Sequence, residues 1–110
     1  MSYSIITSEN FVKELKRLAK RYPSIKQDMA SLGETLVENP IQGSPLGRNC
    51  YKIRLAIKSK GRGKRGGSRV ITCVIALQES VTLLSIFDKA DQATISDQEL
   101  ERLLTENDLA

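Results

Sequence analysis

The chain has 110 residues, of which 17 are Lys or Arg and 13 are Asp or Glu, so its formal net charge is +4. This length predicts one domain, and 40% apolar with 27% charged residues is typical of a globular protein rather than a disordered or fibrous one. The sequence contains no His, which excludes catalytic groups that depend on imidazole and zinc sites that use it as a ligand.

The first part of the chain predicts a short strand and two helices. Ser8 offers an N-cap hydroxyl for a helix that ends before Pro23, because the residue preceding a proline avoids the α region. Ser24, with Gln27 three residues later, forms a capping-box pattern at the start of a second helix. The expected elements are a strand at 3–7, a helix at 8–22 and a helix at 24–38. The apolar positions at helical spacing are Phe11, Leu15 and Leu18 in the first helix and Ile25, Met29, Leu32 and Leu36 in the second.

The middle of the chain predicts a loop, a strand and a second loop. Pro and Gly recur through residues 39–49, which is the composition of a loop. Residues 50–58 alternate apolar and basic side chains, and this period of two is typical of a half-buried strand. Tyr51, Ile53, Leu55 and Ile57 are expected on one face, and Lys52, Arg54 and Lys58 on the other. Residues 59–68, SKGRGKRGGS, are expected to form a flexible loop, which we call the basic loop.

The last part of the chain predicts a hairpin and a helix. Residues 69–77 and 81–87 are β-branched runs separated by a short polar segment, which indicates two antiparallel strands. Ser96 and Glu99 form a second capping-box pattern, which predicts the start of a terminal helix. Its apolar positions are Leu100, Leu103 and Leu104, with Ile95 just before the helix.

The order of these elements predicts an α+β domain over residues 1–110. We expect a small antiparallel sheet that contains the N-terminal strand and a three-strand meander. The sheet is expected to pack against the N-terminal helical hairpin, with a C-terminal helix, and with the helices on one face.

Charge is divided sharply along the chain. Residues 1–38 sum to +1, residues 39–78 to +9 without a single Asp or Glu, and residues 79–110 to −6. A solvated loop that aids solubility could explain a few of these cations. Forty residues without a carboxylate favour a polyanionic partner for the middle of the chain.

Gly61 to Gly66 match the spacing G-x-G-x-x-G of dinucleotide-binding loops. That motif requires the glycines to lead from a strand into a helix whose N-terminus binds the pyrophosphate, whereas the next expected element here is a strand. A kinase glycine-rich loop does lie between strands, but 110 residues are too few for the catalytic lobe. The spacing therefore indicates a mobile loop whose cations attract phosphate.

Cys50 and Cys73 are the two cysteines, and they are 23 residues apart without C-x-x-C spacing. Neither a metal site nor a disulfide framework is expected from them. The N-terminus lacks the features of a signal peptide, and no stretch approaches the roughly 18 apolar residues of a membrane span. These features predict a cytoplasmic protein with free thiols and no membrane association.

The basic side of the 50–58 strand suggests chemistry on a phosphodiester. Neighbouring cations on it are about 6.5 to 7 Å apart, which is comparable with successive phosphates of a single strand. Across the basic loop, Arg69 is expected near Lys58. A lysine among other cations loses proton affinity and can act as a general base, and an arginine can stabilise a pentavalent phosphorane.

The order of elements, the strand at 50–55 (CYKIRL), the strand opening with Arg69 and the run LSIFDK at 84–89 resemble toxins of the RelE/ParE superfamily of bacterial toxin–antitoxin modules. The resemblance covers nearly the whole chain and implies the α+β fold expected above. For RelE-like members it implies mRNA cleavage in the ribosomal A site, without a metal or cofactor, by attack of the 2′-hydroxyl on the adjacent phosphate.

The resemblance also implies site residues. Lys52 is the expected general base, and Arg54 and Arg69 are expected to stabilise the transition state. Further cations are expected to bind RNA, namely Arg48, Lys58, Lys60, Arg62, Lys64, Arg65 and Lys89. RelE-like enzymes often carry another Arg and a Tyr or His near the end of the last strand. Here that region contains Phe87 and Asp88, and only Lys89 could supply the missing cation or acid.

The expected partners are mRNA on the ribosome and a cognate antitoxin whose acidic, partly disordered segment covers the basic face in a hetero-oligomeric complex. Two other functions stay open: inhibition of DNA gyrase in the manner of ParE, and a degenerate relative that only binds antitoxin or RNA. The acidic residues at 97–108 could cover the basic face, but we expect them to be the solvated side of the terminal helix.

Overall fold

The computed structural model describes residues 2–110, which form three α-helices, five strands and two short 3-10 helices. The strands are β1 (Ser4–Thr7), β2 (Ser44–Gly47), β3 (Cys50–Leu55), β4 (Ser68–Ile75) and β5 (Ser80–Asp88). The helices are α1 (Glu9–Arg21), α2 (Ile25–Glu38) and α3 (Asp97–Glu106), with 3-10 turns η1 (Lys58–Lys60) and η2 (Ala76–Gln78). No helix within this range is long and apolar enough to cross a membrane.

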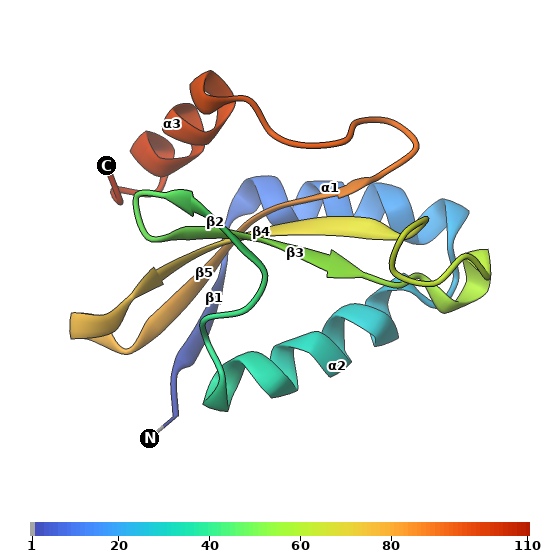
Figure 1. Ribbon diagram of the computed structural model, residues 1–110, viewed down its shortest axis with the longest axis horizontal. Helices are drawn as coiled ribbons and strands as arrows, with labels where there is room; N and C mark the ends of the chain where they lie inside the picture. Colours follow the sequence, from blue (N-terminus) through green and yellow to red (C-terminus); the bar gives the residue numbers. More distant parts are fainter. Residues whose placement is uncertain (1) are drawn as a thin grey trace.

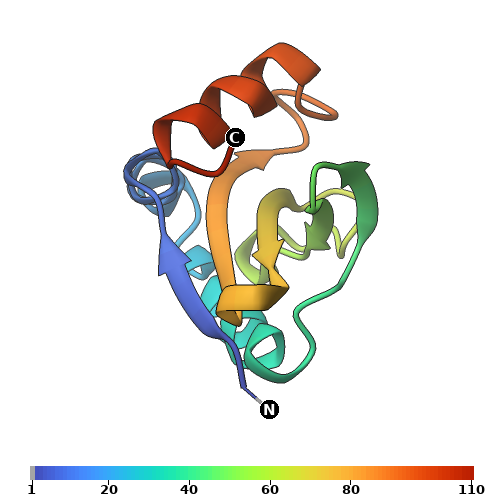
Figure 2. The same ribbon diagram turned by 90° about the vertical axis from the view of Figure 1, so that its left-hand side faces the viewer.

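The strands form one sheet in the order β1-β5-β4-β3-β2, with β1 and β2 at its two edges (Figure 2). β3, β4 and β5 are consecutive antiparallel neighbours, as the meander prediction requires. β1 pairs with β5 in parallel, so the sheet is mixed rather than wholly antiparallel. The α+β class, with a helical hairpin between β1 and the meander, is confirmed.

β2 is an element that the composition of residues 39–49 did not predict. Ser44 lies opposite Lys52 and Pro45 opposite Tyr51, so part of the expected loop pairs with β3. A proline lacks an amide donor and is tolerated at a sheet edge, where no further strand needs that donor. The loop prediction was therefore wrong for Ser44–Gly47, because pairing with β3 overrides a turn-like composition.

The sheet is covered on both faces. One buried cluster joins α1 and α2 to the sheet through residues such as Phe11, Ile25 and Val70, whereas a second contains Leu100 and Leu103 of α3. Figure 1 shows α2 below the sheet and α3 above it. The expectation of helices on one face holds for the hairpin and is wrong for α3.

Two of the three predicted capping hydroxyls cap a helix. Ser8 Oγ accepts from Phe11 N at 3.1 Å, and Ser96 Oγ accepts from Glu99 N at 3.1 Å. Ser24 makes no such bond, since its hydroxyl donates to Asp28 Oδ2 at 2.7 Å and accepts from Ser59 N at 2.8 Å. The prediction of a capping box at Ser24 was wrong, and this hydroxyl instead fastens the start of α2 to η1.

Side chains of α1 replace a missing strand beside β5. β1 pairs with β5 only as far as Leu83, so the next backbone groups of β5 lack a strand partner on that side. Glu14 Oε1 accepts from Ile86 N at 3.2 Å and from Ser85 Oγ at 2.7 Å, while Asn10 Nδ2 donates to Leu84 O at 3.0 Å. Burial raises the pKa of Glu14, and these hydrogen bonds oppose the rise.

Glu14→Ala should lower the free energy of unfolding by about 1 to 3 kcal/mol, because Ser85 and the Ile86 amide lose their acceptor. Urea unfolding at pH 7 measures the loss. Lys13→Ala is the control, since this exposed neighbour on α1 makes no hydrogen bond or ion pair within residues 2–110. Equal unfolding free energies for the two variants would show that α1 does not protect the β5 edge.

Candidate nucleic-acid interface

Three predicted catalytic residues, Lys52, Arg54 and Arg69, lie on neighbouring strands and form what we call the cationic trio. Lys52 and Arg54 are two residues apart on β3, and Arg69 on β4 is the direct partner of Arg54. Side chains two residues apart share one face of a strand, so Lys52 and Arg54 share the face that carries Cys50 and, further along the sheet, α3. The strand predicted at 50–58 was too long, because β3 ends at Leu55 and Lys58 belongs to η1.

The register of β3 and β4 places the Cα atoms of Arg54 and Arg69 closer together than those of a hydrogen-bonded cross-strand pair. Val74 N donates to Asn49 O at 2.8 Å, so these opposed residues form a hydrogen-bonded pair. Hydrogen-bonded and non-hydrogen-bonded pairs alternate along an antiparallel ladder. The Arg54–Arg69 pair lies five positions beyond the Asn49–Val74 pair. It is therefore a non-hydrogen-bonded pair, with Cα atoms about 4.5 Å apart. Like charges directly opposite one another destabilise a sheet, so this position favours an anion.

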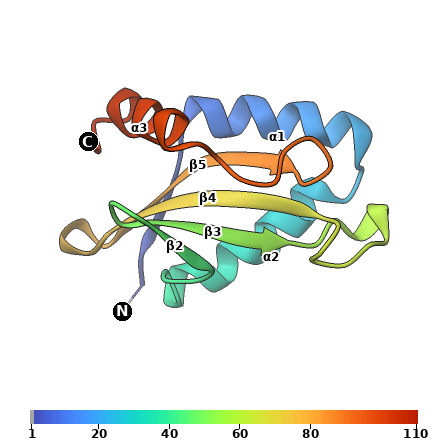
Figure 3. The same ribbon diagram turned by 45° about the horizontal axis from the view of Figure 1, so that its top comes forward.

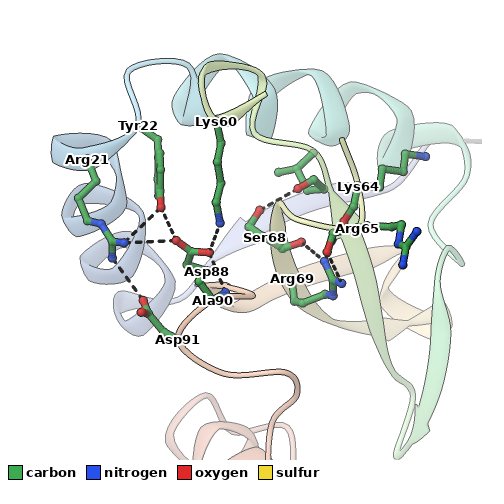
Figure 4. A network of polar contacts seen from close by, with 11 residues as sticks. Arg21, Tyr22, Lys60, Lys64, Arg65, Ser68, Arg69, Asp88, Ala90 and Asp91 are labelled. Carbon is green, nitrogen blue, oxygen red and sulfur yellow. Dashed lines mark hydrogen bonds and ion pairs between the residues drawn. The ribbon is translucent and has the colours of Figure 1, made fainter. Parts of the chain in front are cut away.

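Arg69 is buried, with 5% of its surface exposed, and its guanidinium holds the basic loop. Nη1 donates to Lys64 O at 3.0 Å and to Ser68 O at 3.1 Å, and Nη2 donates to Arg65 O at 3.4 Å (Figure 4). Burial, together with the nearby Arg54, lowers the pKa of Arg69. Arg69 therefore contributes a fixed positive charge and also orders the backbone on which other cations stand.

Lys52 and Arg54 differ from Arg69 in their contacts. Lys52 Nζ donates to Thr94 Oγ1 at 3.2 Å, in the segment that doubles back along β5 towards α3 (Figure 3). The exposed Arg54 guanidinium makes no hydrogen bond or ion pair with any residue between 2 and 110. A charge held at a sheet surface without a protein counter-ion is available to an anionic ligand.

Several contacts join the basic loop to the rest of the protein. Lys60 Nζ pairs with Asp88 Oδ1 at 2.6 Å, Lys89 N donates to Gly67 O at 3.1 Å, and Arg69 binds three loop carbonyls. A Cβ at Gly67 would lie 2.2 Å from Leu55 O, so this glycine lets the loop approach β3 closely. The loop leads into β4 rather than a helix, so the backbone lacks the helix N-terminus that a dinucleotide motif uses.

Asp88, at the end of β5, is the acceptor at the centre of this network (Figure 4). Its fully buried carboxylate accepts from Lys60 through Oδ1 and from Tyr22 Oη through Oδ2, at 2.6 and 2.5 Å. Arg21 Nη2 lies 3.5 Å from Oδ2, and Ala90 N donates to Oδ1 at 2.9 Å. Burial alone would raise the pKa of Asp88, but the hydrogen bonds from Lys60, Tyr22 and Ala90 lower it to about 2.

The lowered pKa of Asp88 predicts a specific loss of stability in acid. The unfolded group has a pKa near 3.8, so its stabilising contribution, about 2 kcal/mol, is complete above that value and is lost as pH falls through 2. Urea unfolding of the wild type and Asp88→Asn at several pH values measures it. The wild type should be more stable at pH 7, and the difference should shrink towards pH 2. A difference that does not depend on pH would contradict this assignment.

The other predicted RNA-binding cations occupy three places. Arg54, Lys58 and Lys64 line a pocket of about 330 Å³ at the β3 edge beside α2. Lys60, Arg62 and Lys89 line a second pocket, of about 430 Å³, on the other side of the basic loop. Arg65 is exposed in that loop. Arg48 lies in the β2–β3 turn, at the opposite end of β3 from the basic loop, so the structure does not bring it to the others.

Of the ten predicted site residues, the structure ties three to other groups of the protein: Lys52, Lys60 and Arg69. Seven carry side chains that form no hydrogen bond or ion pair within residues 2–110: Arg48, Arg54, Lys58, Arg62, Lys64, Arg65 and Lys89. Asp88 and Tyr22 were not among the residues expected to have a role. In the sequence, Asp88 stands out only as an acidic residue at the end of a strand, close to several basic residues. That pattern does not identify the side chains that bind it.

The two cysteines are buried cross-strand partners. The neighbouring Cys73 thiol and burial together raise the pKa of Cys50. Both lie in the cluster beneath α3, and their sulfurs approach the Arg48 carbonyl. Residues 2–110 contain no group of three His, Cys, Asp or Glu side chains arranged to hold a metal ion.

A family model described as the RelE toxin of the RelE/RelB toxin–antitoxin system matches residues 11–107. This match covers most of the chain and includes the cationic trio, the basic loop and Asp88. No match was found among curated protein sequences.

Solved structures of similar fold come from the same kind of protein. A double mutant of E. coli RelE in the free state is 24% identical, with a TM-score of 0.64 over 93% of this chain and 98% of that one. The toxin-antitoxin complex RelBE2 of Mycobacterium tuberculosis contains a chain that is 18% identical. Its TM-score is 0.60, over 83% of this chain and 95% of that one. At these identities the similarity establishes the fold.

Proposed function

This chain belongs to the RelE family of toxins from toxin–antitoxin systems, and from that premise we propose that it cleaves mRNA on the ribosome as a metal-independent endoribonuclease. The observation that carries the proposal is the pairing of Arg54 with Arg69 beside Lys52. Membership of the family by itself shows that the chain is a toxin of this kind. The cationic trio gives a surface on which a phosphodiester can be bound and activated.

Each member of the cationic trio has a distinct proposed role. Lys52 takes the proton from a ribose 2′-hydroxyl, whose oxygen then attacks the adjacent phosphorus. Arg54 stabilises the extra negative charge on the phosphorane, and the fixed charge of Arg69 adds to the same field. The bond to the 5′-oxygen breaks, leaving a 2′,3′-cyclic phosphate. Lys89, which is exposed and close to the basic loop, is the cation that could protonate the departing oxygen.

The experiment that tests this function maps mRNA ends on ribosomes. Purified protein is added to ribosomes stalled on a defined mRNA, and primer extension locates any new 5′ end. Cleavage within the A-site codon is expected, and it should persist in EDTA at a concentration that the ribosomes tolerate. Intact mRNA in the presence of folded protein would reject the proposal.

A second candidate, binding without cleavage, is favoured by one observation. Phe87 provides a ring without a hydroxyl at the end of β5, and Asp88 is occupied by Lys60 and Tyr22. Protonation of the leaving oxygen therefore depends on Lys89. Cleavage by the wild type separates the two candidates, and in an active enzyme Lys89→Ala should lower the cleavage rate by about 10² to 10⁴-fold because it removes the proposed acid.

We also propose that an acidic antitoxin segment binds the basic loop and the β3 edge. The exposed cations Lys58, Arg62, Lys64 and Arg65 would contact its carboxylates. Such contacts are screened by salt, so the dissociation constant of the purified complex should rise by at least about tenfold between 0.05 and 0.5 M NaCl. Isothermal titration calorimetry measures it. A dissociation constant that does not change with salt would show that the contact is mainly apolar.

A further inference from the structure

The basic loop carries three exposed cations, with a fourth beside it, and one buried anion, Asp88, binds a side chain at the start of the loop. The cations are Arg62, Lys64, Arg65 and, beside the loop, Lys89. Asp88 binds the ammonium of Lys60 at the start of the loop, and the next residue, Lys89, binds Gly67 O at its end. Both ends of the loop are thus fastened to the end of β5. Neither contact enters the chemistry proposed for the cationic trio.

We propose that Asp88 is a positioning residue that acts through Lys60 to hold the basic loop where its cations meet the RNA backbone, an inference that rests on the proposed function. Lys60 is the loop residue through which Asp88 acts. Its side chain is only 14% exposed, and its ammonium lies 5.5 Å from the centre of the Tyr22 ring as well as 2.6 Å from Asp88. An ammonium bound in this way is a structural group rather than a free RNA contact, which revises the role expected for Lys60.

The carboxylate of Asp88 cannot be replaced by a neutral group of the same shape. Oδ1 accepts from Lys60 and Ala90, and Oδ2 accepts from Tyr22 and lies beside Arg21, so both oxygens receive donors. An asparagine would offer one oxygen and present an amide donor to the remaining donors. Asp88→Asn therefore removes the charge that holds Lys60 and also opposes donor to donor, while nearly preserving the volume.

An effect of net charge alone and an effect of loop position predict opposite changes in RNA binding for Asp88→Asn. Asp88→Asn raises the net charge of the protein by one, so charge alone predicts tighter binding of RNA. Positioning predicts weaker binding, because the loop cations lose their fixed location. The loop cations contact the RNA backbone before and during reaction, whereas Lys52 and Arg54 stay on β3. We therefore expect kcat/KM for ribosome-bound mRNA to fall by about tenfold or more, mainly through a higher KM.

Two measurements test the proposal on the full chain. Hydrogen exchange of the backbone amides at 61–67 reports the order of the loop, and cleavage on stalled ribosomes gives kcat and KM. The variants are Asp88→Asn, Lys60→Met and the double variant, each assayed well below its unfolding temperature. Lys58→Met is the matched control for exchange, because it removes the same charge from η1 without touching Asp88.

Faster loop exchange in Asp88→Asn and Lys60→Met, but not in Lys58→Met, is the expected result. The double variant should cleave no more slowly than Lys60→Met, because Asp88 acts through Lys60. Unchanged loop exchange in Asp88→Asn, or cleavage equal to or faster than wild type, would overturn the inference. A fall in kcat alone would overturn it as well, since that result would place Asp88 in the chemical step. If the wild type cleaves no mRNA, the proposed function fails and with it the catalytic part of the inference, whereas exchange still decides whether Asp88 holds the loop.

Discussion

Lys52→Ala should lower the rate of mRNA cleavage on stalled ribosomes by about 10² to 10⁴-fold, because it removes the proposed general base. Arg54→Ala should lower it by about 10² to 10³-fold, because it removes the exposed guanidinium that faces the developing charge. Both losses should appear in kcat, since each group acts on the reacting phosphate. Single-turnover cleavage with excess protein measures them without interference from product release.

The same two variants should remain folded. The Arg54 guanidinium makes no hydrogen bond or ion pair within residues 2–110, and Lys52 makes one bond to Thr94, so unfolding free energies should change by less than about 1 kcal/mol. Lys13→Ala on α1 controls for the loss of one positive charge far from the cationic trio. If Lys52→Ala and Arg54→Ala cleave as fast as Lys13→Ala, the catalytic site must lie elsewhere.

The fold could be predicted largely because its buried faces leave a periodic record in the sequence. Alternation from Tyr51 to Leu55 marked β3, and helical spacing of Phe11, Leu15 and Leu18 marked α1. β2 could not be predicted, because a short edge strand needs few apolar residues and tolerates Pro45. The parallel pairing of β1 with β5 joins residues about 76 positions apart, and no local pattern specifies such a partner.

The candidate site could be predicted in composition but only partly in geometry. The alternation placed Lys52 and Arg54 on one face correctly, but it extended the strand to Lys58, whereas β3 ends at Leu55 and Arg69 pairs with Arg54. After Leu55 the chain turns into η1, and Gly67 approaches Leu55 closely, and the alternation signals neither feature. The role of Asp88 depends on Lys60 and Tyr22, which are 28 and 66 positions away, so its partners follow from the folded structure alone.

Arg69→Lys should be nearly as harmful to stability as Arg69→Ala, although it preserves the charge. Two terminal nitrogens of Arg69 reach the carbonyls of Lys64, Ser68 and Arg65, and a single ammonium cannot span them. Because the side chain is buried, the lost contacts leave polar groups without partners. We expect the unfolding free energy to fall by about 1 to 3 kcal/mol in urea titrations.

Arg54→Lys is the matched control, since it makes the same substitution on the directly opposed residue, whose guanidinium has no contact to lose within residues 2–110. Its unfolding free energy should equal that of the wild type. Cleavage by Arg69→Lys should fall by about 10²-fold, because a displaced loop and a displaced charge act together at the phosphate. Full stability in Arg69→Lys would mean that charge alone matters at this position, and the backbone contacts of the guanidinium would then be incidental.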